Sequence, residues 1–219
     1  MISKMNLCGL LTIGMVLSGC VKKTPQNPAE QQQTQQTQQV QQMNENTENE
    51  REIVSVQNKK VKLETTMGDI VIEMQSDAAP GTVKNFLEYV EDGFYNGIIF
   101  HRVIPGFMIQ TGGFDAQMQR RQARGPIKNE FKISNTRGTV AMAKLGGDPD
   151  SATCQFFISV ADNSSNLDRQ NGGFTVFGKV VEGMEVADKI AAVSTTVRSG
   201  MQNVPVVPVV INSASVITE

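Results

Sequence analysis

One stretch of the chain reads Phe100-His101-Arg102-Val103-Ile104-Pro105-Gly106-Phe107-Met108-Ile109-Gln110 and places an arginine in the middle of an apolar strand. A charged side chain at such a position is usually paired or faces a functional site. Pro105-Gly106 predicts a turn, which brings residues 107–110 back toward Arg102. One fixed cation, one amide and several apolar side chains suit an apolar ligand that carries a carbonyl and an amide. The same set does not suit hydrolysis.

The globular part is typical of a protein built mainly from short strands. Alternating apolar and polar residues predict strands over 61–66, 70–74, 98–104, 107–111, 138–144, 155–161, 174–181 and 207–217. Pro208 cannot donate a hydrogen bond, so the last strand should lie at a sheet edge or contain a bulge there.

Helical spacing of apolar residues predicts two helices. One has Pro80 in its first turn, Asp77 or a neighbour as its cap, and ends at Gly93, and the other runs from Met184 to about Val193. Short strands, two helices and no βαβ repeat favour a closed antiparallel barrel with helical lids. Periodicity alone leaves a β-sandwich open as the alternative.

Composition bounds the architecture and the partners. The 219 residues, of which 39% are hydrophobic, suffice for one domain with a core and a sizeable non-globular segment. A formal net charge of −2 provides no positive field for a polyanion, and aromatic residues that could stack on bases make up only 5%. We therefore expect no nucleic acid among the partners.

Residues 1–19 have the pattern of a lipoprotein signal peptide. Lys4 precedes an apolar run, residues 7–17, which is too short to span a bilayer comfortably. The ending Leu17-Ser18-Gly19-Cys20 resembles the bacterial lipobox, in which the cysteine is acylated and becomes the first mature residue. We therefore expect a membrane anchor at Cys20 in the cell envelope, and Val21 favours the outer membrane, facing the periplasm. An ordinary secretory signal with a chance cysteine is the alternative.

Residues 20–57 differ in composition from the rest of the chain. After the cysteine they are rich in glutamine, contain Pro25 and Pro28, and include almost nothing apolar. Such a segment cannot offset its ordering entropy by burial. We expect a disordered tether that holds the globular domain, residues 58–219, away from the membrane. An aggregating or partner-binding tract is the alternative, against which the interspersed proline and glutamate argue.

The positions of the three cysteines predict no disulfide within the globular domain. Cys8 lies in the signal peptide and Cys20 would carry lipid, so Cys154 has no partner in the globular domain. Cys154 stands in an apolar run and is expected to be a buried small hydrophobic residue.

The stretch 100–110 resembles the signature of the cyclophilins, a family of peptidyl-prolyl cis/trans isomerases. Gln155-Phe156-Phe157, Leu167 and Val176-Phe177-Gly178-Lys179-Val180 continue the resemblance in the same order. It covers about residues 60 to 217. The segments 185–190 and 202–211 look most like the periplasmic cyclophilins of Gram-negative bacteria.

The resemblance implies a mainly β fold: a closed eight-stranded antiparallel β-barrel capped by two α-helices, with a proline pocket on its outer face. It implies isomerisation of X-Pro bonds, with proline-containing polypeptides as substrates and without a metal or organic cofactor. A monomer is the expected state.

The resemblance also implies roles for particular residues. Arg102 should be catalytic, and Gln110 should orient Arg102 and the substrate carbonyl. The apolar pocket for the proline ring should consist of Phe107, Met108, Phe157 and Leu167, with Phe174 where the family has His or Tyr. The groove for the residues before the proline should be lined by Ala141, Ala143 and Gln155, and by the backbone of Met142, where eukaryotic members commonly have Asn.

Three features depart from the family pattern or lie beside it. Asn166 stands where vertebrate members have the Trp that contacts cyclosporin, which puts strong drug binding in doubt. His101 falls on the opposite strand face from Arg102 and is interpreted as a structural histidine. The stretch between Gly113 and Ile127 is interpreted as a solvated basic loop, and steering of acidic substrates is the alternative. Its arginines are Arg120, Arg121 and Arg124.

Three classes of function fit these observations. The first is an isomerase that accelerates the folding of envelope proteins. The second is a module that holds proline-containing chains as a chaperone with little turnover, against which intact Arg102 and Gln110 argue. The third is a structural surface lipoprotein that reuses the fold, which the retention of a full pocket disfavours.

Overall fold

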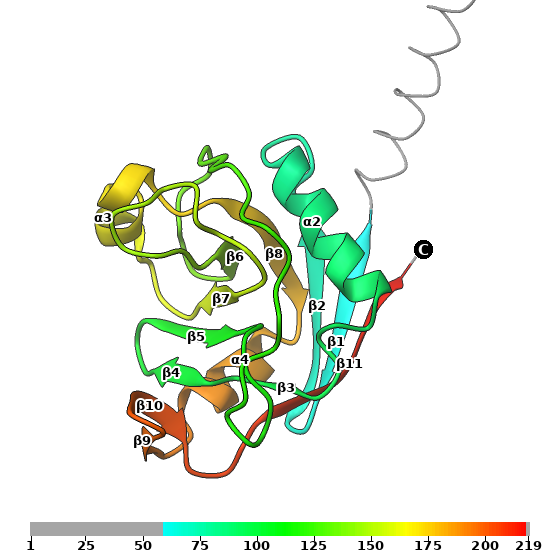
Figure 1. Ribbon diagram of the computed structural model, residues 1–219, viewed down its shortest axis with the longest axis vertical. Helices are drawn as coiled ribbons and strands as arrows, with labels where there is room; N and C mark the ends of the chain where they lie inside the picture. Colours follow the sequence, from blue (N-terminus) through cyan, green and yellow to red (C-terminus); the bar gives the residue numbers. More distant parts are fainter. Residues whose placement is uncertain (1–58, 218–219) are drawn as a thin grey trace, which may run out of the picture. The chain divides into compact units, whose positions relative to one another are not determined.

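The computed structural model describes residues 59–217 of the chain (Figure 1). The predictions for the signal peptide, for Cys20 and for the tether concern residues outside this part. Within residues 59–217, no helix is both long and apolar enough to cross a membrane.

A sheet of nine antiparallel strands forms the body of the fold (Figure 1). From one edge to the other it comprises β3 (Ile98–Ile99), β11 (Val210–Ile217), β1 (Lys60–Thr65), β2 (Gly68–Met74), β8 (Val176–Glu182), β6 (Thr139–Met142), β7 (Phe156–Ser159), β5 (Met108–Thr111) and β4 (Arg102–Ile104). A separate hairpin consists of β9 (Thr195–Arg198) and β10 (Met201–Pro205). The helices are α2 (Pro80–Glu91), α3 (Ser164–Leu167), α4 (Met184–Ala191) and the 3-10 turn η1 (Gln170–Gly172).

The closed eight-stranded barrel that we expected is not confirmed. The sheet has nine strands, and in the described part of the chain no ladder joins its outer strands, β3 and β4. The single strand expected over 98–104 is split at Phe100 and His101, which are both buried. Its first half pairs with β11 and its second half with β5. The two edges of the sheet are thus consecutive pieces of one segment, and the sheet is open but curled.

The curled sheet encloses the main apolar core. Aromatic rings form its centre, where the ring of Phe86 lies 5.3 Å from that of Phe156 and 4.9 Å from that of Phe177. Phe86 comes from α2, which packs against β11 and β8, while α4 packs against β2, β5 and β4. The two helices predicted from apolar spacing are therefore confirmed, and each buries its apolar side against the sheet.

The last strand differs from the prediction. It begins at Val210, so Pro208 precedes it, and it lies between β1 and β3 rather than at an edge. A strand at this place needs its backbone donors for two neighbours, which a proline within it could not supply. Two further elements, the hairpin β9–β10 and the helix α3, were not predicted.

Candidate active site

The strands β5, β6 and β7 send alternate side chains to opposite faces of the sheet. Ile109, Val140 and Ile158 belong to the main core. The residues on the other face form a second apolar cluster together with two residues from later in the chain. This outer cluster consists of Met108, Ala141, Phe157, Leu167 and Val176. It provides an apolar floor on the outer side of the sheet.

A groove of about 340 Å³ opens over this outer cluster. Its walls come from the hairpin β4–β5, from the end of β6, from β7 and from the segment that contains α3 and η1. The lining residues are Arg102, Phe107, Met108, Gln110, Ala143, Lys144, Phe157, Asn166, Leu167, Gln170 and Phe174.

The hairpin β4–β5 brings the polar and apolar parts of the groove together. Arg102 and Gln110 stand opposite each other in its ladder. In the turn, the backbone N–H of Phe107 donates to the carbonyl of Ile104 (3.1 Å), and Gly106 has a φ of +69°, which glycine adopts without strain. The turn predicted at Pro105-Gly106 is therefore present.

A chain of three side chains holds the cation in place. The Nη1 of Arg102 donates to the Oε1 of Gln110 (3.3 Å), and the Nε2 of Gln110 donates to the Oε1 of Gln155 (2.9 Å). Within residues 59–217, Arg102 forms no ion pair. Partial burial lowers the pKa of Arg102 from its usual value, yet a guanidinium remains charged in a protein at neutral pH. The groove thus contains a positioned cation without a neutralising carboxylate.

The apolar walls of the groove are tied to one another. The rings of Phe157 and Phe174 meet edge to face, with centroids 5.7 Å apart. Asn163 is buried. Its Nδ2 donates to the backbone carbonyl of Phe107 (2.9 Å), and its backbone carbonyl accepts from the N–H of Leu167 (2.9 Å). One asparagine therefore sets the spacing between the two sides of the pocket.

Lys144 completes the rim of the groove. Its Nζ donates to the carbonyls of Asn171 (2.6 Å) and Gly173 (2.5 Å) and lies 4.9 Å from the centre of the Phe174 ring. Burial lowers the pKa of Lys144. Because both of its hydrogen bonds go to the segment that carries Phe174, Lys144 holds that wall of the groove in position.

The chemistry available to the groove follows from its lining. Among the described residues, no carboxylate, hydroxyl, thiol or imidazole lines it, and Cys154 is buried elsewhere. Such a groove can hold an apolar ring and direct a hydrogen bond from Arg102 at a polar atom next to it. It offers a conformational change of the ligand rather than bond cleavage.

Residues 60–216 match the family model of the cyclophilin type peptidyl-prolyl cis-trans isomerase/CLD. The chain belongs to the cyclophilin family. It is 51% identical over 165 residues to a peptidyl-prolyl cis-trans isomerase of Acinetobacter baylyi, covering 74% of this chain and 87% of that protein. It is 53% identical over 163 residues to peptidyl-prolyl cis-trans isomerase B of Escherichia coli, covering 71% of this chain and 98% of that protein.

A solved structure agrees with the cyclophilin fold. A cyclophilin type peptidyl-prolyl cis-trans isomerase of Cryptosporidium parvum superimposes with a TM-score of 0.61 over 74% of this chain and 98% of its own, at 24% identity. With the family match and relatives at about half identity, the protein is a cyclophilin-type peptidyl-prolyl cis-trans isomerase. Cyclophilins bind proline-containing peptides as substrates.

The structure of this cyclophilin brings most of the predicted site residues into one groove. Ala141 lies in the floor beneath it. Gln155 is not among the lining residues, but its side chain accepts a hydrogen bond from Gln110, which is. Met142 was expected to contribute only its backbone; its side chain points into the main core and is 2% exposed, and its N–H donates to the carbonyl of Thr175. The remaining predicted residues line the groove: Arg102, Phe107, Met108, Gln110, Ala143, Phe157, Leu167 and Phe174.

Sequence reasoning had assigned no binding role to three lining residues, Lys144, Asn166 and Gln170. If β6 continued, Lys144 would point to the opposite face from Ala143. Because β6 ends at Met142, this alternation does not apply, and both residues line the groove. Asn166 and Gln170 come from α3 and η1, two short helical turns without an apolar period. No apolar pattern in the sequence could have located Gln170, whereas the resemblance had already placed Asn166 where vertebrate members contact cyclosporin.

His101 lies behind the site rather than in it. It is 1% exposed and packs against Phe114, with ring centroids 4.8 Å apart. Desolvation lowers its pKa to about 4, although hydrogen bonds with the Ile99 backbone and the Gln155 side chain act in the opposite direction. Its Nδ1 has no hydrogen-bond partner among the described residues. His101 is therefore neutral at physiological pH.

Proposed function

We propose that this cyclophilin isomerises X-Pro bonds in polypeptides of the bacterial cell envelope, with Arg102 as its catalytic residue. The observation that supports the catalytic part is the guanidinium of Arg102, held by Gln110 over an apolar floor without a carboxylate partner. We also propose that the active state is a monomer.

The proposed mechanism follows from the chemistry of the peptide bond. Delocalisation of the nitrogen lone pair gives a rotational barrier of about 18–20 kcal/mol, and an X-Pro bond isomerises in tens to hundreds of seconds unaided. In the twisted state the lone pair is localised on the prolyl nitrogen. A guanidinium directed at that nitrogen by the Arg102–Gln110 pair binds the twisted state more strongly than either planar state, which is what acceleration requires.

The other groove residues have distinct parts in this proposal. Phe107, Met108, Phe157 and Leu167 hold the proline ring still while the carbonyl side rotates. The amide of Gln110 uses one N–H on Gln155 and has a second N–H available for the substrate carbonyl. Removal of about 7 kcal/mol from the barrier would accelerate the rotation about 10⁵-fold.

The catalytic proposal is tested by replacing Arg102. We expect Arg102→Ala to lower the catalysed exchange of a short X-Pro peptide by about 100-fold or more, since a directed hydrogen bond to the transition state is lost. Exchange NMR on the peptide measures this rate in the full-length protein. The matched control is Arg169→Ala, because Arg169 is exposed and does not line the groove. Rapid exchange by the Arg102 variant would contradict the assignment.

The envelope part of the proposal rests on the sequence before the globular domain. Leu17-Ser18-Gly19-Cys20 has the pattern of a lipidation site, and the glutamine-rich residues 21–57 have the composition of a tether. A diacyl anchor with a third chain would hold the protein on the membrane stably, whereas one chain would not. We propose attachment to the outer membrane on its periplasmic side, where unfolded envelope proteins pass.

A further inference from the structure

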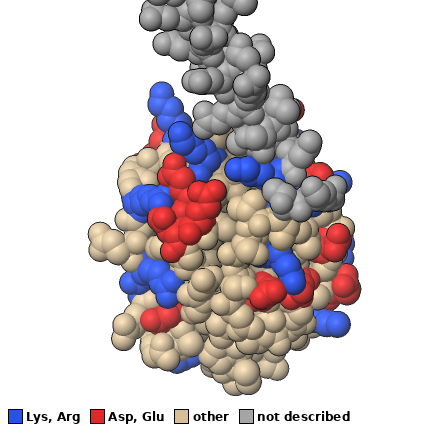
Figure 2. All heavy atoms as spheres, turned by 90° about the vertical axis from the view of Figure 1, so that its right-hand side faces the viewer, with Lys and Arg blue, Asp and Glu red and all other residues tan. Residues whose placement is uncertain are grey.

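The direction of Arg102 depends on a side chain that does not itself line the groove. Gln110 accepts from Arg102 (3.3 Å) and donates its own Nε2 to the Oε1 of Gln155 (2.9 Å). On the face shown in Figure 2, acidic and basic side chains lie next to one another, and such a mixed surface does not orient a guanidinium from a distance. Arg102 is therefore directed by local hydrogen bonds, and it is fixed only as well as Gln155 is.

Gln155 packs against Gly113, in the loop that follows β5. A Cβ on Gly113 would lie 2.5 Å from the Nε2 of Gln155, 2.8 Å from its Cδ and 3.0 Å from its Cγ. These separations are far below the optimal distance between carbon atoms, about 3.5–4.0 Å. Gly113 does not have a positive φ, so its backbone conformation does not require a glycine. The side chain of Gln155 therefore occupies the space that a side chain at position 113 would need.

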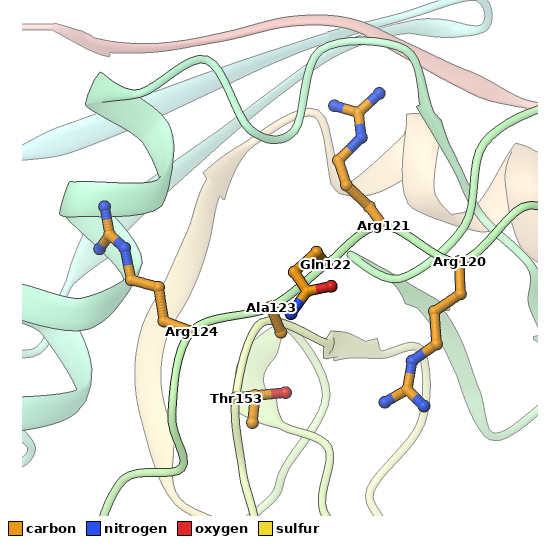
Figure 3. Close-up of a pocket in the computed structure, with 6 residues that line it drawn as sticks. All are labelled: Arg120, Arg121, Gln122, Ala123, Arg124 and Thr153. Carbon is orange, nitrogen blue, oxygen red and sulfur yellow. The ribbon is translucent and has the colours of Figure 1, made fainter.

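The loop that carries Gly113 is anchored. The Gly113 carbonyl accepts from the N–H of Arg121 (3.0 Å), and the Arg121 side chain donates to two backbone carbonyls in the turn after α2. Arg124 pairs with two carboxylates at the end of α2. In Figure 3 the guanidinium groups of Arg121 and Arg124 point away from Thr153, which lies two residues before Gln155. A side chain at position 113 would therefore displace Gln155 rather than the loop.

A buried ring also holds Gln155. His101 is 1% exposed and hydrogen-bonds with the side chain of Gln155. The ring of His101 lies against that of Phe114, the residue after Gly113, with centroids 4.8 Å apart. Gln155 thus has a buried histidine and an anchored loop as neighbours, which leave its amide little room to turn. This arrangement sets the direction in which Gln155 offers its Oε1 to Gln110.

We propose that Gly113 is a positioning residue of the isomerase reaction. Because it has no side chain, Gln155 can hold Gln110 in place, and Gln110 in turn directs Arg102 at the prolyl nitrogen. The inference rests on the proposed function, since it takes Arg102 to be the catalytic residue. Gly113 is not among the residues that line the groove. A methyl group at this position should therefore lower the rate of isomerisation and leave the binding of the peptide nearly unchanged.

The test replaces Gly113 in the full-length protein. We expect Gly113→Ala to slow the catalysed exchange of a short X-Pro peptide at saturation by about tenfold, because a small misplacement of a catalytic group is costly. The dissociation constant of the peptide should change by less than about twofold. Exchange NMR gives the rate and NMR titration gives the dissociation constant. The matched control is Gly125→Ala, since a Cβ on this exposed glycine would meet nothing within 4 Å and its φ is not positive. The control should leave both quantities unchanged.

A double-mutant cycle distinguishes positioning through Gln155 from a general effect on the fold. Gln155→Ala removes the atoms that a Cβ at position 113 would meet. In this background Gly113→Ala should cause no further loss of exchange, because nothing remains for the methyl group to displace. An equal loss in both backgrounds, or wild-type exchange in the single variant Gly113→Ala, would overturn the inference.

Arg102→Ala and the side-chain amide signals in NMR spectra separate this inference from the proposed function. If Arg102 is not catalytic, Arg102→Ala retains rapid exchange, and the amide signals of Gln110 and Gln155 still show whether Gly113→Ala turns the Gln155 side chain. If only the inference fails, Arg102→Ala loses exchange, while Gly113→Ala keeps the exchange rate and the amide signals of the wild type.

Discussion

Arg102 is a cation whose neighbours position it rather than neutralise it. A carboxylate partner would occupy the N–H groups that a prolyl nitrogen needs, whereas the amide of Gln110 takes only one of them at 3.3 Å. The orientation of that amide is itself fixed by Gln155. A lysine could not replace the arginine well, because its ammonium lacks the planar fork that two amides can align.

The lowered pKa of His101 predicts how the stability of the protein depends on pH. Its pKa is lowered to about 4 in the folded protein, while an unfolded histidine has a pKa near 6.5. Below pH 6.5 His101 takes up a proton in the unfolded chain but stays neutral in the native state. The free energy of unfolding therefore falls as the pH falls from 6.5 toward 4. The loss at this one site approaches about 3 kcal/mol at the lower limit.

This contribution of His101 can be isolated with His101→Phe, which keeps an aromatic ring beside Phe114. Urea unfolding of wild type and variant should give a free-energy difference that changes between pH 7 and pH 4.5 in the variant's favour. Carboxylates titrate in the same range in both proteins and cancel in the difference. A difference that is independent of pH would show that His101 has the same pKa in the native and unfolded states, and would contradict the lowered pKa.

At the residue scale, the sequence predicts which side chains are candidates for function better than it predicts the direction in which each side chain points. An arginine in an apolar strand next to a turn indicated a candidate site, since charge is expensive to bury without a purpose, and the resemblance to the cyclophilins supplied the roles of the other residues. The inward side chain of Met142 depends on where β6 lies in the sheet, and the rim position of Lys144 depends on where β6 ends. Neither is encoded in the local pattern.

At the scale of elements, the start of α2 depends on a residue far away in the chain. Its N-cap, Ala79, has no side-chain cap, and the expected cap at Asp77 or a neighbour is not the one found. The carboxylate of Glu130 instead accepts from the N–H groups of Gly81 (3.1 Å) and Thr82 (2.8 Å) and from the Thr82 hydroxyl (2.7 Å). A negative charge at this end also suits the helix dipole.

Glu130→Ala should therefore destabilise the protein by about 1 kcal/mol, the usual cost of removing an N-cap. The control is Glu91→Ala, which removes an exposed carboxylate from the opposite end of the same helix, where it is not favoured by the dipole. The midpoint of urea unfolding measures both. The account of the cap is wrong if the two variants unfold at the same urea concentration.

The elements missed from the sequence, the hairpin β9–β10 and α3, are short and bury few residues. Strand β9 is exposed at three of its four residues, so it has no alternation to detect. Its hairpin turns at Ser199-Gly200, where both residues have positive φ. Asn, Asp or Gly is the usual first residue of such a turn, so Ser199 gives no sequence signal for it. The split of residues 98–104 could not be predicted either, because the strand-like pattern runs through both halves and only their pairing partners differ.

At the scale of the whole molecule, the proposed lipid anchor predicts where the full-length protein is found. In a Gram-negative bacterium, the full-length chain should yield a mature membrane-bound protein that begins at an acylated Cys20, as seen by mass spectrometry. Cys20→Ala should remove the acyl mass and the membrane attachment, because the thiol that receives the lipid is gone. Cys8→Ala, within the signal peptide, is the matched control and should have no effect. A mature chain without lipid would contradict the anchor.

The central claim is that Arg102 acts on the twisted peptide bond and contributes little to holding the planar substrate. The most direct measurement compares the dissociation constant and the catalysed exchange rate of one X-Pro peptide in wild type and in Arg102→Ala. We predict that binding changes by about threefold or less while exchange falls by about 100-fold or more. Binding and exchange that fall by the same factor, or exchange that persists in the variant, would contradict the claim.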